Sequence, residues 1–74
     1  MANIEYKPPQ LKGEGYEVAI YNMAGELHEV LSPFDEERMW YHFEKLVQFH
    51  SFTFSVVAYK HGAEIRREKG KGKF

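Results

Sequence analysis

The chain has 74 residues, a formal net charge of −1 and no cysteine, and 16% of its residues are aromatic. A chain of this length forms one small domain that buries about 60% of the surface its unfolded form exposes. The absence of cysteine excludes a disulfide framework and a thiolate nucleophile. No apolar run approaches the roughly 20 residues that span a bilayer, and the N-terminus lacks the apolar segment of a signal peptide, so we expect a soluble, cytoplasmic protein.

The small net charge hides an uneven distribution along the chain. Residues 1–59 carry four basic and nine acidic residues, a net charge of −5, whereas residues 60–74 carry six basic and two acidic residues, a net charge of +4. An acidic body with a basic end hints at a polyanionic partner, but a Lys-rich end also serves simply to keep a protein in solution.

Residues 1–15 are predicted to form an extended N-terminal arm. Pro8 and Pro9, followed by Gly13 and Gly15, disfavour both a helix and a central strand. This arm is either a frayed terminus or a segment that orders by docking on the body or on a partner.

A β-hairpin is predicted after the arm. Residues 16–22 alternate in the manner of a strand with one buried face. Residues 22–26 then form a loop in which Gly25 supplies the positive φ of a type I turn with a G1 bulge. Residues 27–31 return as the second strand, although their alternation is irregular.

The segment 32–50 has the clearest helical periodicity in the chain. We expect Ser32 to cap its N-terminus, Pro33 to occupy the first turn and Asp35 to complete a variant of the capping box. At 100° per residue the residues of one stripe are mostly apolar: Met39, Trp40, Phe43, Leu46, Val47 and His50. This stripe is therefore predicted to pack on the rest of the domain.

Two further strands are predicted after the helix. Residues 52–59 alternate strongly, with Phe52 and Phe54 on the side that faces the helix, and residues 63–67 return after a tight turn. The fold class is therefore α+β, in the order β-β-α-β-β, with a four-stranded, mainly antiparallel sheet and one helix packed on one face. The strand order stays open at this point, and so does exchange of a strand with a second protomer.

The domain is thus expected to span residues 16–67, followed by a flexible basic tail over residues 68–74. One helix covers only one face of the sheet, so the other face is predicted to be open to solvent. Residues able to contact a partner are predicted to gather on this open face: Tyr21, Thr53, Ser55, Tyr59 and Arg66. Such side chains can stack on bases and contact phosphates, or anchor a protein partner. Tyr and Thr are also simply good strand formers.

Two other surfaces are candidate binding sites. Basic residues in and beside the tail could neutralise phosphates: Arg67, Lys69, Lys71 and Lys73. The outer face of the helix presents Arg38, Tyr41 and Lys45. A solvated terminus and ordinary intrahelical pairs are the plain structural explanations for these two groups.

No sequence motif points to catalysis. The chain has no Gly-rich phosphate loop, no nucleophile beside a base and no histidine pair with zinc spacing, so we expect neither enzymatic activity nor a metal or cofactor. The leading hypothesis is a small binding module, monomeric or homodimeric and without membrane contact, that docks on a larger protein or nucleoprotein assembly and modulates it as an adaptor or inhibitor. The alternative is a DNA- or RNA-binding protein that uses Tyr21, Tyr59, Arg66 and the tail.

Overall fold

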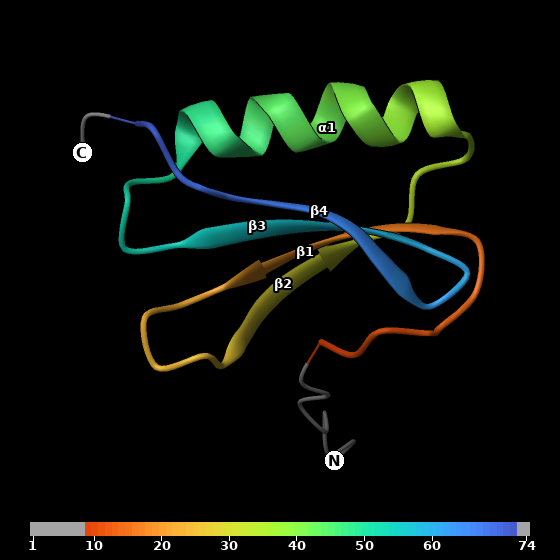
Figure 1. Cartoon of the computed structure of the whole chain (residues 1–74), viewed down its shortest axis with the longest axis horizontal. Helices are drawn as coiled ribbons and strands as arrows, with labels where there is room; N and C mark the ends of the chain where they lie inside the picture. The colour runs from red at the N-terminus through yellow and green to blue at the C-terminus, as the bar shows by residue number, and fades with distance from the viewer. Residues whose placement is uncertain (1–8, 73–74) are drawn as a thin grey trace, which may run out of the picture.

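The computed structural model describes residues 9–72, which form one antiparallel sheet and one helix. The elements follow in the order β1 (Tyr16–Tyr21), β2 (Leu27–Leu31), α1 (Glu36–Phe49), β3 (Ser55–Lys60) and β4 (Ala63–Lys69). The strands are arranged in the order β2-β1-β3-β4, and α1 lies along one face of the sheet (Figure 1). The predicted α+β fold and its element order are confirmed.

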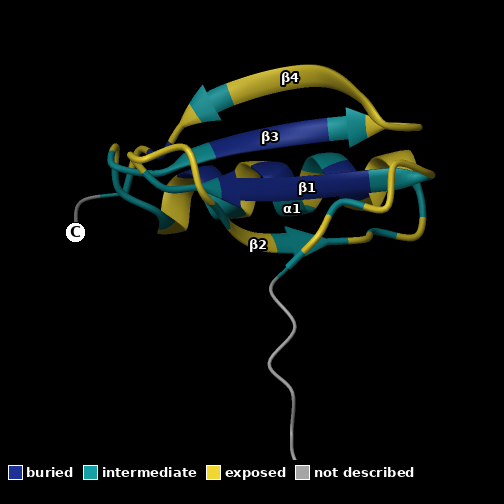
Figure 2. Ribbon diagram, turned by 90° about the horizontal axis from the view of Figure 1, so that it is seen from below, coloured by how far each residue is buried: buried dark blue, intermediate teal, exposed yellow. Residues whose placement is uncertain are grey.

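The helix connects the two hairpins in a way that places β1 and β3 in the middle of the sheet. β1 pairs with both β2 and β3, so the chain passes over β1 as it runs from β2 through α1 to β3. Figure 2 shows that the central strands β1 and β3 are mostly buried, whereas the edge strands β2 and β4 are half-buried or exposed.

The core lies between α1 and the two central strands. Its buried side chains come from these three elements: Val18, Met39, Phe43, Val47, Val56 and Ala58. Met39, Phe43 and Val47 are spaced four residues apart and therefore share one side of the helix. Trp40 packs against this cluster, and its ring meets the Phe43 ring edge-on with 5.7 Å between centroids. The predicted buried face of the helix is confirmed.

The helix begins later than predicted, because its cap is Asp35 and not Ser32. The Asp35 carboxylate accepts a hydrogen bond of 2.8 Å from the backbone N–H of Arg38, the third residue of the helix. A carboxylate at this position also interacts favourably with the positive end of the helix dipole, which a hydroxyl group cannot do to the same extent. Ser32 and Pro33 belong to the connection between β2 and α1.

The third strand begins at Ser55, so the prediction that it starts at Phe52 is wrong. Residues 51–54 form a turn, in which the backbone N–H of Phe54 donates to the carbonyl of Ser51 at 3.0 Å. This turn directs Phe52 away from the core and leaves the side chain 69% exposed. Phe52 therefore belongs to the surface and does not face the helix as expected.

The residues after Arg67 are not a free tail. β4 continues to Lys69, and the backbone N–H groups of Gly70, Lys71 and Gly72 then donate to carbonyl groups of residues 54, 47 and 50, at 2.9, 2.6 and 2.8 Å. Two of these acceptors lie in the last turn of α1 and at its cap, where carbonyl groups lack partners within the helix. The structure therefore corrects the predicted flexible tail for residues 68–72, while Lys73 lies outside the described residues.

Glycine is required at position 70 because two segments of backbone approach closely there. Gly70 is buried, and a Cβ atom at this position would collide with the carbonyl oxygens of His50 and Ser51. A Cβ atom at Gly72 would lie 2.7 Å from the carbonyl oxygen of Gln48. The alternation of Lys and Gly thus reflects tight packing on the end of the helix.

Candidate functional site

The strand register determines which side chains lie on the face of the sheet opposite α1. Three cross-strand pairs of β1 and β3 share this face: Glu17–Tyr59, Ala19–Val57 and Tyr21–Ser55. The middle pair is completely buried, although the helix lies on the other side of the sheet. Side chains on this same face must therefore shield it from solvent.

Tyr21 and Tyr59 provide much of this shielding. They lie diagonally across the small pair Ala19–Val57, and their hydroxyl oxygens are 2.8 Å apart, within hydrogen-bonding distance. The two tyrosine side chains, which we call the tyrosine bridge, thus span the middle pair and are half-buried themselves. This part of the predicted open face is closed by its own side chains.

The tyrosine bridge predicts a loss of stability at alkaline pH. Burial, followed by the hydrogen bond to Tyr21, raises the pKa of Tyr59 well above its usual value near 10. Above pH ~10 the unfolded chain releases this proton while the folded chain retains it, so the free energy of unfolding falls as pH rises. Below pH ~10 both states hold the proton and this contribution does not change with pH.

We expect Tyr59→Phe to flatten the pH dependence of stability above pH ~10 relative to the wild type. The difference in slope should stay well below the limit of about 1.4 kcal/mol per pH unit, because Tyr59 is partly exposed and solvent screens it. Urea unfolding of both proteins from neutral to strongly alkaline pH measures this difference. Parallel stability profiles would show that Tyr59 titrates normally.

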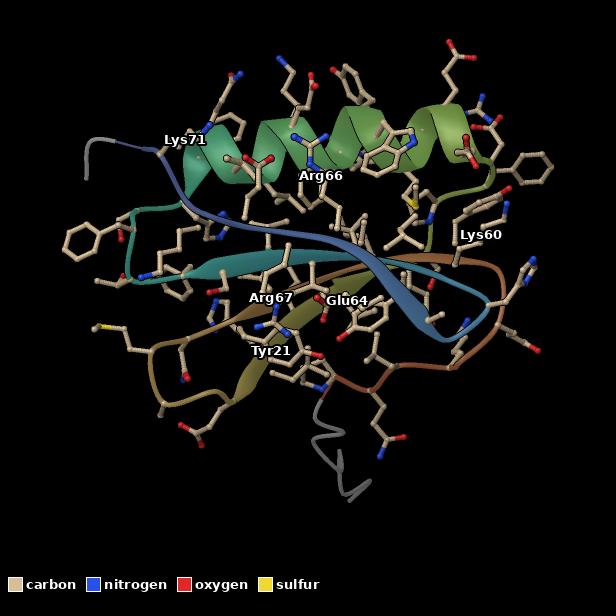
Figure 3. All side chains as sticks on the ribbon, in the orientation of Figure 1. Tyr21, Lys60, Glu64, Arg66, Arg67 and Lys71 are labelled. Carbon is tan, nitrogen blue, oxygen red and sulfur yellow. The ribbon has the colours of Figure 1, made fainter. Side chains whose placement is uncertain are left out.

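An ion pair of β4, between Glu64 and Arg67, lies beside Tyr21 (Figure 3). Arg67 donates two hydrogen bonds to the Glu64 carboxylate, at 2.9 and 3.3 Å. These bonds raise the pKa of Arg67 and lower the pKa of Glu64. The Arg67 guanidinium also lies 6.0 Å from the centroid of the Tyr21 ring. The guanidinium therefore lies over one side of that ring.

Arg66 lies on the helix side of the sheet, so its predicted place on the open face is wrong. A register shift in the β3–β4 pairing places Arg66 opposite Ala58, whose side chain belongs to the core. Its guanidinium carbon lies 5.9 Å from the centroid of the Trp40 ring and 5.6 Å from the centroid of the Phe43 ring. Figure 3 shows this side chain directed toward α1. The irregularity breaks the strict alternation of β4, and Arg67 takes the place expected for Arg66.

A groove of about 530 Å³ opens on the sheet face opposite α1, at the end where Tyr21 pairs with Ser55. It lies between the β1–β2 turn and the α1–β3 loop. Its lining brings together Tyr21, Thr53 and Ser55 with Arg67 and Lys69. The first three were predicted on the open face and the last two in the tail. The groove thus joins residues from two surfaces that were predicted to be separate.

Met23 and Phe52 border the same groove from two different loops. Met23 belongs to the β1–β2 turn and is 77% exposed, and Phe52 belongs to the α1–β3 loop and is 69% exposed. Neither was predicted as a binding residue. A methionine in a hairpin loop was an available signal, whereas the exposure of Phe52 depends on the unexpected turn before β3.

The remaining predicted binding residues lie away from the groove. Lys71 forms an ion pair of 3.6 Å with Glu68 near the end of the helix. On the outer face of α1, Arg38 pairs with Asp35 at 3.3 Å, and the Lys45 ammonium lies 5.6 Å from the centroid of the Tyr41 ring. The two contacts on α1 are ordinary helix-surface pairs that spacing alone produces.

The described part of the N-terminal arm docks on the opposite end of the same sheet face. The backbone N–H groups of Lys12 and Gly13 donate to the Glu17 carboxylate at 2.8 and 3.0 Å, and Glu17 is only 1% exposed. The backbone N–H of His61 donates to the carbonyl of Gly15 at 2.8 Å. The docking alternative therefore holds for these residues, and they leave the groove uncovered.

Residues 9–72 offer neither a metal site nor a membrane-spanning helix. Within this range no three His, Asp or Glu side chains are placed to hold a metal ion. The described part of the chain also contains no helix with the length and hydropathy needed to cross a membrane. No protein-family description matches the chain, and no curated protein or solved structure is similar enough to it to count as a match.

Proposed function

We propose that this protein is a small non-enzymatic binding module that docks on a larger protein through the groove beside Met23 and Phe52 and modulates that protein by occupying its surface. The observation that carries the proposal is the exposure of these two large apolar side chains on loops that border one groove. Exposed apolar residues rimmed by polar groups are typical of protein interaction sites, and methionine and aromatic residues are enriched there.

Hydrogen bonds of the backbone and of side chains hold both loops in place. In the β1–β2 turn the N–H of Asn22 donates to the carbonyl of Glu26 at 3.0 Å, and the Asn22 side chain accepts from the N–H of Glu26 at 2.9 Å. In the α1–β3 loop the Ser51 and Thr53 hydroxyl oxygens lie 2.6 Å apart, within hydrogen-bonding distance. Because both loops are already ordered, a partner would spend little free energy on organising them.

Binding of single-stranded nucleic acid to the sheet face has weaker support. Base stacking requires free ring faces on Tyr21 and Tyr59. These rings instead span the buried pair beneath them, and Arg67 covers part of Tyr21. Glu64 also places a negative charge at this position, where a phosphate would be repelled. The geometry therefore favours a protein partner.

The proposal predicts that the double substitution Met23→Ser with Phe52→Ser weakens binding of the partner at least tenfold. Anchors at the centre of an interface commonly contribute more than 1–2 kcal/mol each, and tenfold corresponds to about 1.4 kcal/mol. Stability should change by no more than about 0.5 kcal/mol per site, because both side chains are exposed. Quantitative affinity capture from extract of the expressing cells measures the loss.

Phe34→Ser is the matched control, because Phe34 is 86% exposed but lies outside the groove, before the helix. We expect this variant to capture the same proteins as the wild type. Equal capture by the wild type and the double variant would contradict the proposal. Tight binding of oligonucleotides at moderate salt by the wild type, but not by the double variant, would also contradict it.

A further inference from the structure

We infer that the occupant of the groove is an acidic segment of the partner protein, in which a carboxylate stands next to an apolar or aromatic anchor. This inference rests on the proposed function and specifies the chemistry of the partner. Its basis is the combination of two basic side chains, Arg67 and Lys69, with two exposed apolar side chains, Met23 and Phe52, around one groove.

The charge of the groove is opposite to that of the chain. The whole chain has a net charge of −1, with 11 acidic and 10 basic residues. The groove lining includes two basic residues, and none of the acidic residues between positions 9 and 72 contributes to it. A positive groove on a slightly acidic protein selects a negative partner and disfavours a positive one.

The two basic residues differ in how much of their charge is available. Arg67 shares its charge with Glu64 through two hydrogen bonds, which leaves three of the five guanidinium donors unused by that carboxylate. Lys69 forms no ion pair with any residue in the described range 9–72, whereas Arg66 and Lys71 both pair with Glu68. The groove therefore has about one positive charge in excess, located on Lys69.

A residue with a hydroxyl group, Ser55, lies on the strand next to Lys69. Lys69 is paired with Ser55 in the β3–β4 register, so the two side chains share one face and lie on neighbouring strands. An ammonium group and a hydroxyl group on neighbouring strands of one sheet face can both donate hydrogen bonds to one carboxylate. The apolar anchor of the same segment would then contact Met23 and Phe52.

A nucleic acid fits these features less well than an acidic peptide does. The affinity of proteins for a phosphate backbone grows with the number of phosphates neutralised, and the groove lining includes two basic side chains, of which Arg67 already shares its charge with Glu64. Of the two exposed apolar side chains, only Phe52 has an aromatic ring on which a base could stack, and Met23 has none. A peptide that combines one carboxylate with one apolar anchor uses both parts of the groove.

Selection from a phage-displayed library of random linear peptides tests this inference on the full-length protein. We expect the selected peptides to contain Asp or Glu next to an aromatic or large aliphatic residue. Lys69→Gln should weaken their binding about three- to fivefold, since an exposed ion pair contributes less than about 1 kcal/mol, and Lys69→Glu should weaken it about tenfold. Fluorescence anisotropy with labelled peptides at low and high salt measures these changes.

Lys71→Gln is the matched control, because Lys71 follows the same strand but pairs with Glu68 away from the groove. It should bind the selected peptides as the wild type does. Selected peptides without acidic residues that still require Met23 and Phe52 would overturn the inference and leave the proposed function intact. Failure to select any peptide, together with oligonucleotide binding that Lys69→Gln weakens, would overturn both.

Discussion

Replacing Phe43 with alanine is expected to lower the free energy of unfolding by about 3–5 kcal/mol. Among residues 9–72, Phe43 is the largest fully buried side chain, and it is only 1% exposed. It contacts the core cluster from the middle of α1, and its ring packs edge-on against Trp40. The substitution removes this apolar surface from the core and leaves a cavity between the helix and the central strands, which the surroundings fill only in part.

The measurement is urea unfolding, monitored through the fluorescence of Trp40, the single tryptophan of the chain. A domain of this length has a total stability of roughly 4–11 kcal/mol, so a loss of this size brings the variant close to unfolding. Phe49→Ala is the control, since Phe49 belongs to the same helix but is 67% exposed, and it should change stability by no more than about 0.5 kcal/mol. Equal losses from both substitutions would mean that α1 packs through another face.

Replacing Gly70 with alanine is expected to lower the free energy of unfolding by about 3 kcal/mol, the upper part of the range for overpacking. The added methyl group meets the carbonyl oxygens of His50 and Ser51, which are backbone atoms and cannot rotate away as a side chain would. The strand end must therefore move off the helix. This movement breaks the hydrogen bonds of Lys71 to Val47 and of Gly72 to His50.

Urea unfolding gives the stability change, and amide hydrogen exchange locates it. We expect the N–H groups of Lys71 and Gly72 to exchange faster in Gly70→Ala than in the wild type, because their acceptors are on the helix end. Lys71→Ala is the control, since it removes an exposed ion pair but keeps the backbone hydrogen bond to Val47, so stability should change by no more than about 1 kcal/mol. A Gly70→Ala protein of wild-type stability with protected amides would contradict the packing described for this end of the chain.

Features that depend on neighbouring residues could be predicted from the sequence. The spacing of Met39, Phe43 and Val47 determined the buried face of α1, because the helical period is the same in any surroundings. Gly25 adopts a φ of +79°, as its hairpin turn was predicted to require. The predicted tight turn after β3 also contains residues with positive φ, +51° at His61 and +83° at Gly62, as two-residue hairpin turns require.

The candidate groove could be predicted only in part. Alternation placed Tyr21 and Ser55 on the same face, and the structure agrees. Alternation failed for Arg66, because the register shift between β3 and β4 depends on how the two strands pair. The residues of β4 contain no sequence signal for this shift. Phe52 was missed for a different reason: a local turn over residues 51–54 competed with the alternating strand pattern of the same residues, and the turn was favoured.

The sequence alone determined the number and type of the elements and the apolar face of the helix, because both follow from periodicity and turn residues within short segments. Only the tertiary structure decided the strand order, the contact between Tyr21 and Tyr59, and the role of the C-terminal glycines. The carbonyl groups that Gly72 and Lys71 approach belong to a helix distant in sequence, and no local pattern specifies such a contact. Close packing of backbone on backbone makes these glycines necessary, and that packing exists only once the sheet and helix have assembled.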